Sequence, residues 1–149
     1  MGCSLTVGFT LSSPQIFCPK GAQREVRVGE SRLDFLVGQT YVEVKGCTLV
    51  KGERALFPDA PTSRGTRHLR TLRELLSKGF QGLLEVLVLR PDAQCFAPNQ
   101  ETDPIFADQF WAAMGEGMEV KAHSFSFDDG RLIYMNGGWA ESSASRGVI

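Results

Sequence analysis

The sequence contains no continuous run of about 18 apolar residues, so it offers no candidate for a membrane-spanning helix. The segment before Lys20 carries no charge and is broken by prolines, whereas a secretory signal has a basic start and an unbroken apolar centre. Its four cysteines form no CxxC pair, and neither histidine stands at zinc-ligand spacing, which argues against a zinc site and a disulfide framework. These absences predict a cytoplasmic protein with free thiols and no membrane partner.

The net charge is also nearly absent, because the chain carries a formal charge of only −1. Its distribution along the sequence is uneven. Residues 20–90 hold 13 basic and 8 acidic side chains, whereas residues 91–149 hold 3 and 9. A phosphate-binding surface requires such a local basic excess, and the excess falls in the half that also contains the candidate site described below.

The length of 149 residues fits one domain with a real hydrophobic core. We predict an irregular leader over residues 1–20, with one strand over 5–11, and an α/β domain over 21–135. A loose tail rich in glycine and serine is predicted for residues 136–149. The periodicities predict strands, a helix, a strand, a second helix and a final hairpin, and therefore a mixed central sheet flanked by helices.

Residues 24–45 predict two strands joined by a turn at residues 38–40. Because side chains alternate along a strand, Leu33, Phe35 and Val37 are expected on one face, with Asp34 on the other.

In the second of these strands, Glu43 and Lys45 share a face, and hairpin pairing would bring Asp34 close to both. Two carboxylates can hold Mg²⁺ or Mn²⁺, and a lysine beside them can orient a water or neutralise charge on a phosphoryl group. The same spacing also fits an exposed ion pair on the polar face of an ordinary hairpin.

A helix is predicted from about residue 64 to residue 78, with Thr62 or Ser63 as its N-cap and leucines at core spacing. Four arginines recur along it at every third position: Arg64, Arg67, Arg70 and Arg73. This stripe could bind phosphates, because the planar guanidinium donates two hydrogen bonds at once. It could equally be a solvated face in which Arg70 pairs with Glu74.

The run Leu83–Leu89 predicts a buried central strand parallel to a neighbour, interrupted by Glu85. Glu85 lies either at an edge facing water or toward the site, and we favour the edge. Asp103 is expected to cap a second helix that begins at Pro104 and buries an aromatic stripe containing Phe106 and Phe110. Residues 91–104 are predicted as a loop, and the closing hairpin as residues 118–127 and 131–134.

Several segments in order resemble the sugar fermentation stimulation protein A family. They are Arg-Glu-Val-Arg-Val-Gly (24–29), Ser-Arg-Leu-Asp-Phe (31–35), Tyr-Val-Glu-Val-Lys (41–45), Cys-Thr-Leu-Val (47–50), Phe-Pro-Asp-Ala-Pro-Thr-Ser-Arg-Gly (57–65) and His-Leu-Arg-Thr-Leu (68–72). The resemblance extends from about residue 24 to about residue 123. It implies a restriction-endonuclease-like core of the PD-(D/E)xK superfamily that binds DNA.

The acid-then-ExK signature of that superfamily maps onto Asp34, Glu43 and Lys45, with Asp34 and Glu43 as metal ligands. The resemblance makes Thr62, Arg64, Gly65 and His68 candidates to support the site, and Glu25 is the nearest counterpart of an upstream helical glutamate. We expect the family's N-terminal OB-fold domain, and the helix that it carries ahead of the segment at residue 24, to be missing here. Some nucleic-acid affinity is therefore expected to be lost.

We therefore predict a DNA-binding protein with a nuclease-like domain. If it is catalytic, Asp34 and Glu43 hold Mg²⁺ or Mn²⁺ and Lys45 positions the water that attacks a phosphodiester. Two alternatives remain open: a DNA-binding regulator of sugar (maltose) metabolism genes that does not cut, and a truncated protein-interaction domain.

Overall fold

The computed structural model describes residues 21–139, with side chains described as far as residue 135. In chain order its elements are β1 (Gln23–Val28), β2 (Ser31–Val37), β3 (Thr40–Cys47), β4 (Leu49–Lys51), β5 (Arg54–Phe57), α1 (Ser63–Ser77), β6 (Gln81–Val88), β7 (Cys95–Pro98), α2 (Pro104–Gly115), β8 (Glu119–Asp128) and β9 (Arg131–Trp139).

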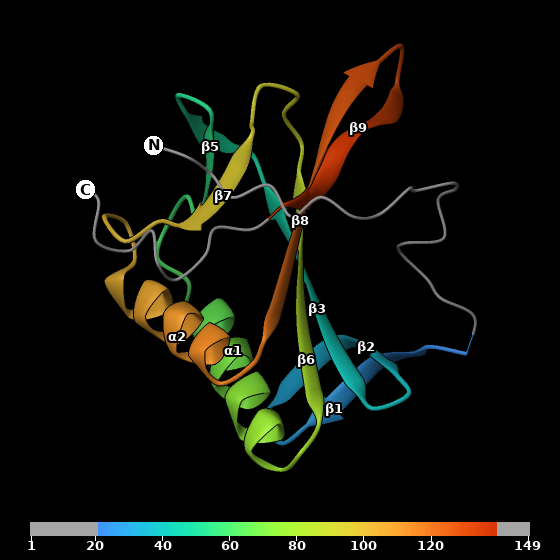
Figure 1. Ribbon diagram of the computed structural model, residues 1–149, viewed down its shortest axis with the longest axis vertical. Coiled ribbons are helices and arrows are strands. Elements are labelled where there is room, and N and C mark those ends of the chain that lie inside the picture. Colours follow the sequence, from blue (N-terminus) through green and yellow to red (C-terminus); the bar gives the residue numbers. More distant parts are fainter. Residues whose placement is uncertain (1–20, 140–149) are drawn as a thin grey trace.

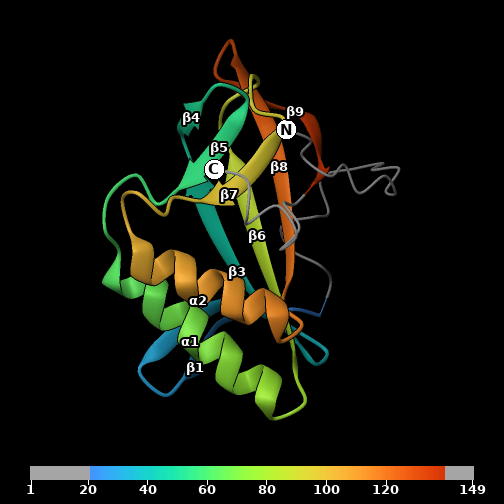
Figure 2. The same cartoon turned by 60° about the vertical axis from the view of Figure 1, so that its left-hand side comes forward.

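Six strands form the main sheet, in the order β1-β2-β3-β6-β8-β9. The three central strands β3, β6 and β8 are parallel, and the outer strands join them antiparallel. Both helices lie on one face of this sheet, and a small sheet β4-β5-β7 stands at its end (Figures 1 and 2). The predicted α/β class with a mixed central sheet is confirmed. We call the two sides of the main sheet the helix-covered face and the bare face.

The hydrophobic core fills the space between the helix-covered face and the helices. Leu69, Leu72 and Leu75 of α1 are nearly fully buried, as are Leu84 and Val86 of β6. Each such side chain contributes about 1.5–3 kcal/mol when it leaves water. The leucine spacing predicted for α1 therefore describes the face that holds the helix to the sheet.

One buried carboxylate fixes the beginning of both helices. Asp103 Oδ1 accepts a hydrogen bond from the Phe106 amide at 2.9 Å, which confirms it as the α2 cap. Its Oδ2 accepts from the Thr62 amide at 2.8 Å. Thr62 in turn caps α1, because its Oγ1 accepts from the Gly65 amide at 3.0 Å. The start of α1 is thus held by α2 as well as by its own cap.

Two stretches differ from their predicted secondary structure. The predicted loop over 91–104 contains β7, which pairs in parallel with β5. The last strand continues beyond Tyr134 to Trp139, so residues 136–139 pair with β8 and are not part of a loose tail. In both places the backbone ladder overrides a composition that is typical of loops. The predicted leader and its strand, and residues 140–149, lie outside the described residues.

The cysteines also differ in part from expectation. Cys47 is a free thiol in the core, but Cys95 is disulfide-bonded, so the prediction of free cysteines throughout is wrong. Within residues 21–139, none of the helices has the length and apolar character needed to cross a membrane.

Candidate active site

Three side chains from β3 and α1 meet on the helix-covered face. Glu43 is 2% exposed, and its Oε1 accepts hydrogen bonds from Lys45 Nζ and from His68 Nδ1, the latter at 2.5 Å. Because an ionised carboxylate only accepts, Nδ1 of His68 carries the proton in this contact. Lys45 Nζ also lies 3.4 Å from His68 Nδ1. Glu43 and Lys45 therefore share a face as predicted, and His68, a candidate to support the site, contacts both.

The second carboxylate oxygen of Glu43 has a different environment. Oε2 is buried, and none of the described residues offers it a hydrogen bond. A buried carboxylate oxygen with no donor costs free energy that the fold would normally avoid. Carboxylate oxygen is also the ligand that hard divalent cations prefer, so the donor chemistry at Oε2 fits Mg²⁺, Mn²⁺ or Ca²⁺.

The local sequence explains why His68 reaches this position. Gly65 lies one turn before it, and a Cβ added there would meet Thr62 Cγ2 at 2.8 Å and Phe106 Cε2 at 3.3 Å. The glycine therefore lets the threonine side chain reach its capping position and lets α2 approach α1 closely. These contacts fix the first turns of α1, and His68 with them, against α2.

Asp34 occupies an irregular point of β2. Leu33 is in the core on the helix-covered face, but Phe35 lines a cavity on the bare face, so the expected alternation breaks between them. Regular pairing with β3 ends at Phe35–Val42, and beyond it Asp34 Oδ2 accepts from the Val44 amide at 2.7 Å. A side-chain oxygen here replaces a carbonyl of the ladder. The prediction of one common face for Leu33, Phe35 and Val37 is therefore wrong.

Asp34 thus lies at the backbone beside the candidate site, although within residues 21–139 it forms no hydrogen bond with Glu43 or Lys45. Nor do three or more His, Cys, Asp or Glu side chains gather closely enough to hold a metal ion anywhere in residues 21–139. Joint metal ligation by Asp34 and Glu43 stays a prediction.

Glu25 is not brought to the site. It is an exposed residue of the outer strand β1 and has a positive φ of 50°, and its Oε1 lies 3.6 Å from Arg32 Nη1. Its predicted supporting role therefore has no geometric basis in this fold. Thr62 supports the site only indirectly, as the cap of α1.

The four arginines of α1 divide into two groups. Arg64, Arg67 and Arg70 are exposed. Arg73 instead donates hydrogen bonds to Glu116 at 2.9 and 2.6 Å and to Gln109 at 2.8 Å. The hydrogen bonds to Glu116 raise the pKa of the guanidinium and lower the pKa of the Glu116 carboxyl. Arg73 therefore links α1 to α2.

Sequence reasoning missed a second buried glutamate–histidine pair, on the bare face. Glu85 lies in the central strand β6, not at an edge, and its Oε2 is 2.7 Å from His123 Nε2. His123 Nδ1 is buried, and no hydrogen-bond partner for it occurs among the described residues. The pairing depends on how β6 and β8 align, which neither strand's own sequence reveals.

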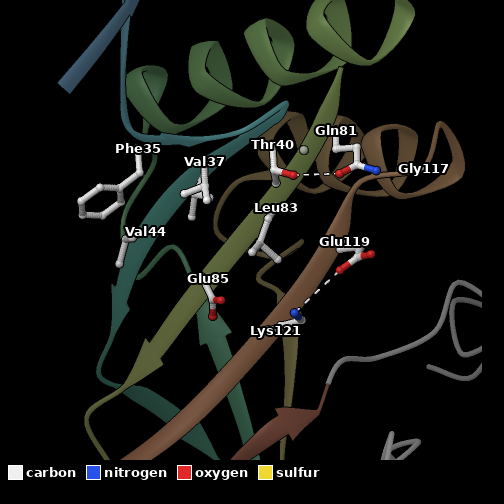
Figure 3. A pocket seen from close by; sticks show the side chains of 12 residues that line it. Phe35, Val37, Thr40, Val44, Gln81, Leu83, Glu85, Gly117, Glu119 and Lys121 are labelled. Carbon is white, nitrogen blue, oxygen red and sulfur yellow. Dashed lines mark hydrogen bonds and ion pairs between the residues drawn. The ribbon is translucent and has the colours of Figure 1, made fainter. Parts of the chain in front are cut away.

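A cavity of ≈ 380 Å³ lies next to this pair on the bare face. Its walls are part apolar, with Phe35, Val44 and Leu83 among them, and part polar, and Glu85 points toward it from β6 (Figure 3). Lys121 also lines the cavity, and its Nζ lies 3.8 Å from Oε2 of Glu119.

Comparison with known proteins gives consistent matches. The family model described as "Sugar fermentation stimulation protein RE domain" matches residues 11–131. The sugar fermentation stimulation protein homolog of Saccharolobus solfataricus is 52% identical over 119 residues, covering 80% of this chain and 50% of that protein. The homolog of Sulfurisphaera tokodaii is 50% identical over 118 residues, covering 79% and 52%.

A solved structure also matches, that of Pyrococcus furiosus SfsA in complex with Ca²⁺. Its TM-score is 0.76 at 34% sequence identity, covering 80% of this chain and 54% of that one. The chain therefore spans about half the length of the relatives that it matches.

Proposed function

The chain belongs to the sugar fermentation stimulation protein family, and from this premise we propose that its nuclease-like domain binds DNA and hydrolyses phosphodiester bonds with a divalent cation. The observation that carries the proposal is Glu43. This buried carboxylate is held at one oxygen by Lys45 and His68, and its other oxygen has no donor among the described residues.

The residues present suit a hard cation. Glu43 Oε2 would be one ligand and the Asp34 carboxylate a second, and Mg²⁺ needs few protein ligands because it keeps several waters. The solved Pyrococcus furiosus relative, described in complex with Ca²⁺, supports this choice of chemistry. When bound, the cation would lower the pKa of a water and neutralise charge on the phosphate.

The protein groups around it would have distinct tasks. His68 is almost fully buried and bonds to Glu43, so it fixes the direction of the carboxylate. The Lys45 side chain keeps 15% of its surface exposed, so its ammonium can also donate to a phosphate oxygen or to the attacking water. The exposed guanidinium groups of Arg64, Arg67 and Arg70 would bind phosphates along α1. Arg73 is left out of this set because it bonds to α2.

The test is cleavage of supercoiled plasmid and of single-stranded DNA by the purified chain with Mg²⁺ or Mn²⁺, with EDTA as the blank. We expect Glu43→Gln and Lys45→Ala to abolish cleavage while circular dichroism shows an intact fold. Glu25→Gln, an exposed carboxylate away from the site, is the matched control and keeps full activity. If the wild-type chain cleaves DNA with none of the divalent ions tested, the catalytic half of the proposal is rejected.

The alternative is a DNA-binding regulator of sugar metabolism genes that does not cut. It is favoured by the lack of a third acidic or histidine ligand near Glu43 within residues 21–139. Binding without cleavage, with affinity falling by about 0.9 log units per phosphate contact for each log unit of salt, would establish it. No retention on DNA at low salt would leave a protein-interaction domain. A cytoplasmic location stays a prediction.

A further inference from the structure

The outer hairpin, made of the distal end of β8 and of β9, exposes most of the large apolar side chains found on the described surface. Phe127, Leu132, Ile133, Tyr134 and Met135 are between 38% and 68% exposed. Outside this hairpin, only Ile105 is comparable among the described residues. The hairpin projects beyond the body of the domain (Figure 1). An apolar cluster of this kind marks a surface that is covered in the working state of a protein.

The exposed residues lie on an edge strand. β9 is the last strand of the main sheet, and its residues 132–135 are four apolar side chains in a row. Successive side chains point to opposite faces, so both faces of β9 are apolar there. This pattern is typical of a strand with a neighbour on each side and cover on both faces.

The opposite edge of the same sheet is protected. β1 exposes the charged side chains of Arg24, Glu25 and Arg27, and Glu25 interrupts its regular backbone with a positive φ of 50°. Charges and irregular backbone are the usual means by which an edge avoids pairing with another chain. Among the described residues, one edge of the main sheet is therefore protected against strand addition, and the other edge, β9, has no further strand beside it.

We propose that β9 pairs antiparallel with β9 of a second copy of this chain. A strand is complementary to itself in an antiparallel ladder, so a twofold axis satisfies both edges and covers the same apolar residues on both copies. The charged β1 edge disfavours head-to-tail pairing of β9 with β1. Nucleic acid is disfavoured as the occupant, because Asp128 and Asp129 are exposed at the hairpin tip with Arg131.

This arrangement has a defined geometry. Complete overlap of Arg131–Trp139 with its symmetry mate places Met135 at the twofold axis. The axis then runs perpendicular to the sheet, as between any two antiparallel neighbours. The two main sheets would form one continuous sheet, with the helices of both copies on the same side.

The first experiment is sedimentation equilibrium of the full chain over a concentration series. We expect a monomer–dimer equilibrium, and we expect Ile133→Lys to raise the dissociation constant at least about tenfold, equal to about 1.4 kcal/mol. The matched control is Ile105→Lys, which puts the same charge at an exposed apolar site on α2, outside the hairpin, and leaves the equilibrium unchanged. Thermal melting confirms that both variants fold. A wild-type monomer at every soluble concentration, or a dimer that tolerates Ile133→Lys, overturns the proposal.

The second experiment tests the register. In Met135→Cys the two new cysteines face each other across the axis, and the 4.5–5.5 Å between paired Cα atoms lies within disulfide range. Oxidation therefore yields a covalent dimer whose cross-linked peptide contains residue 135 twice. In the control Leu132→Cys the equivalent positions lie about 20 Å apart, and no such link forms. A wild-type sample treated identically accounts for the native cysteines. A dimer in which Met135→Cys fails to cross-link overturns the pairing.

Discussion

The two faces of the main sheet each hold a buried glutamate–histidine pair, and the pairs differ in which atom lacks a partner. On the helix-covered face, Glu43 bonds to His68 and Lys45 and leaves a carboxylate oxygen without a donor among the described residues. On the bare face, Glu85 bonds to His123, and the atom without a described partner is a ring nitrogen. A buried carboxylate oxygen without a donor can bind a cation, whereas a buried imidazole nitrogen needs only one hydrogen-bond partner. The comparison agrees with the chemistry proposed for the first pair and predicts a stabilising role for the second.

The largest effect is expected on the bare face. Glu85→Ala leaves both ring nitrogens of the buried His123 without a described partner, so we expect it to lower the free energy of unfolding by about 3–5 kcal/mol. Urea denaturation followed by circular dichroism measures this change. The double variant Glu85→Met with His123→Leu, which removes both polar groups, is expected to recover most of the loss. A single-variant loss below about 1 kcal/mol would mean that the pair contributes little to stability.

The next effect concerns divalent cations and separates the two pairs directly. We expect Glu43→Gln to abolish calorimetric binding of Mn²⁺ and Ca²⁺. His68→Gln, which removes only the support of the ligand, is expected to weaken binding about 10–100-fold. Glu85→Gln serves as the control on the opposite face and keeps the wild-type affinity. Equal losses in Glu43→Gln and Glu85→Gln would contradict the assignment of roles.

A smaller effect tests which part of the helix-covered side meets DNA. Arg70→Ala is expected to reduce the slope of log affinity against log salt by about 0.9, because one phosphate contact is lost. Arg73→Ala removes the link to Glu116 and Gln109, so we expect the slope to remain and the stability to fall by at most about 1 kcal/mol. Fluorescence anisotropy of a labelled duplex over a salt series measures the slope. If Arg73→Ala reduced the slope and Arg70→Ala left it unchanged, the phosphate-binding surface would lie closer to α2.

The smallest effect is one of reactivity. Burial raises the pKa of the Cys47 thiol to about 11, from an ordinary value of 9.0. The native protein therefore gains stability from the neutral thiol at lower pH and loses it as the pH rises from about 9 through 11. At pH 8 we expect iodoacetamide to label Cys47 only after denaturation, as judged by peptide mass spectrometry. Rapid labelling of the native chain would show that the core opens near β5.

The sequence predicted the parts of this comparison that depend on local periodicity. Strand alternation placed Glu43 and Lys45 on one face, and helix spacing with the Thr62 cap placed His68 in the first turns of α1. The hydrogen bond from the Val44 amide to Asp34 was not predicted, because it replaces a carbonyl of the ladder and breaks the alternation that the prediction assumed.

The features that sequence reasoning missed depend on strand order. Glu85 was expected at an edge, but β6 lies between β3 and β8, and only that order sets it beside His123. The extent of β9 also depended on β8 as its pairing partner, because a glycine-rich composition does not indicate a strand by itself.

The beginnings of both helices depend on one residue, Asp103. This one carboxylate accepts hydrogen bonds from backbone amides at the beginnings of both α1 and α2. Losing it would therefore fray both helices together, while the strands of the sheets stay paired. In amide exchange we expect the first turns of the two helices to open as one unit. His68 would then leave Glu43 before the sheet loosens, so local melting at the start of the two helices would disrupt the candidate site without unfolding the sheet.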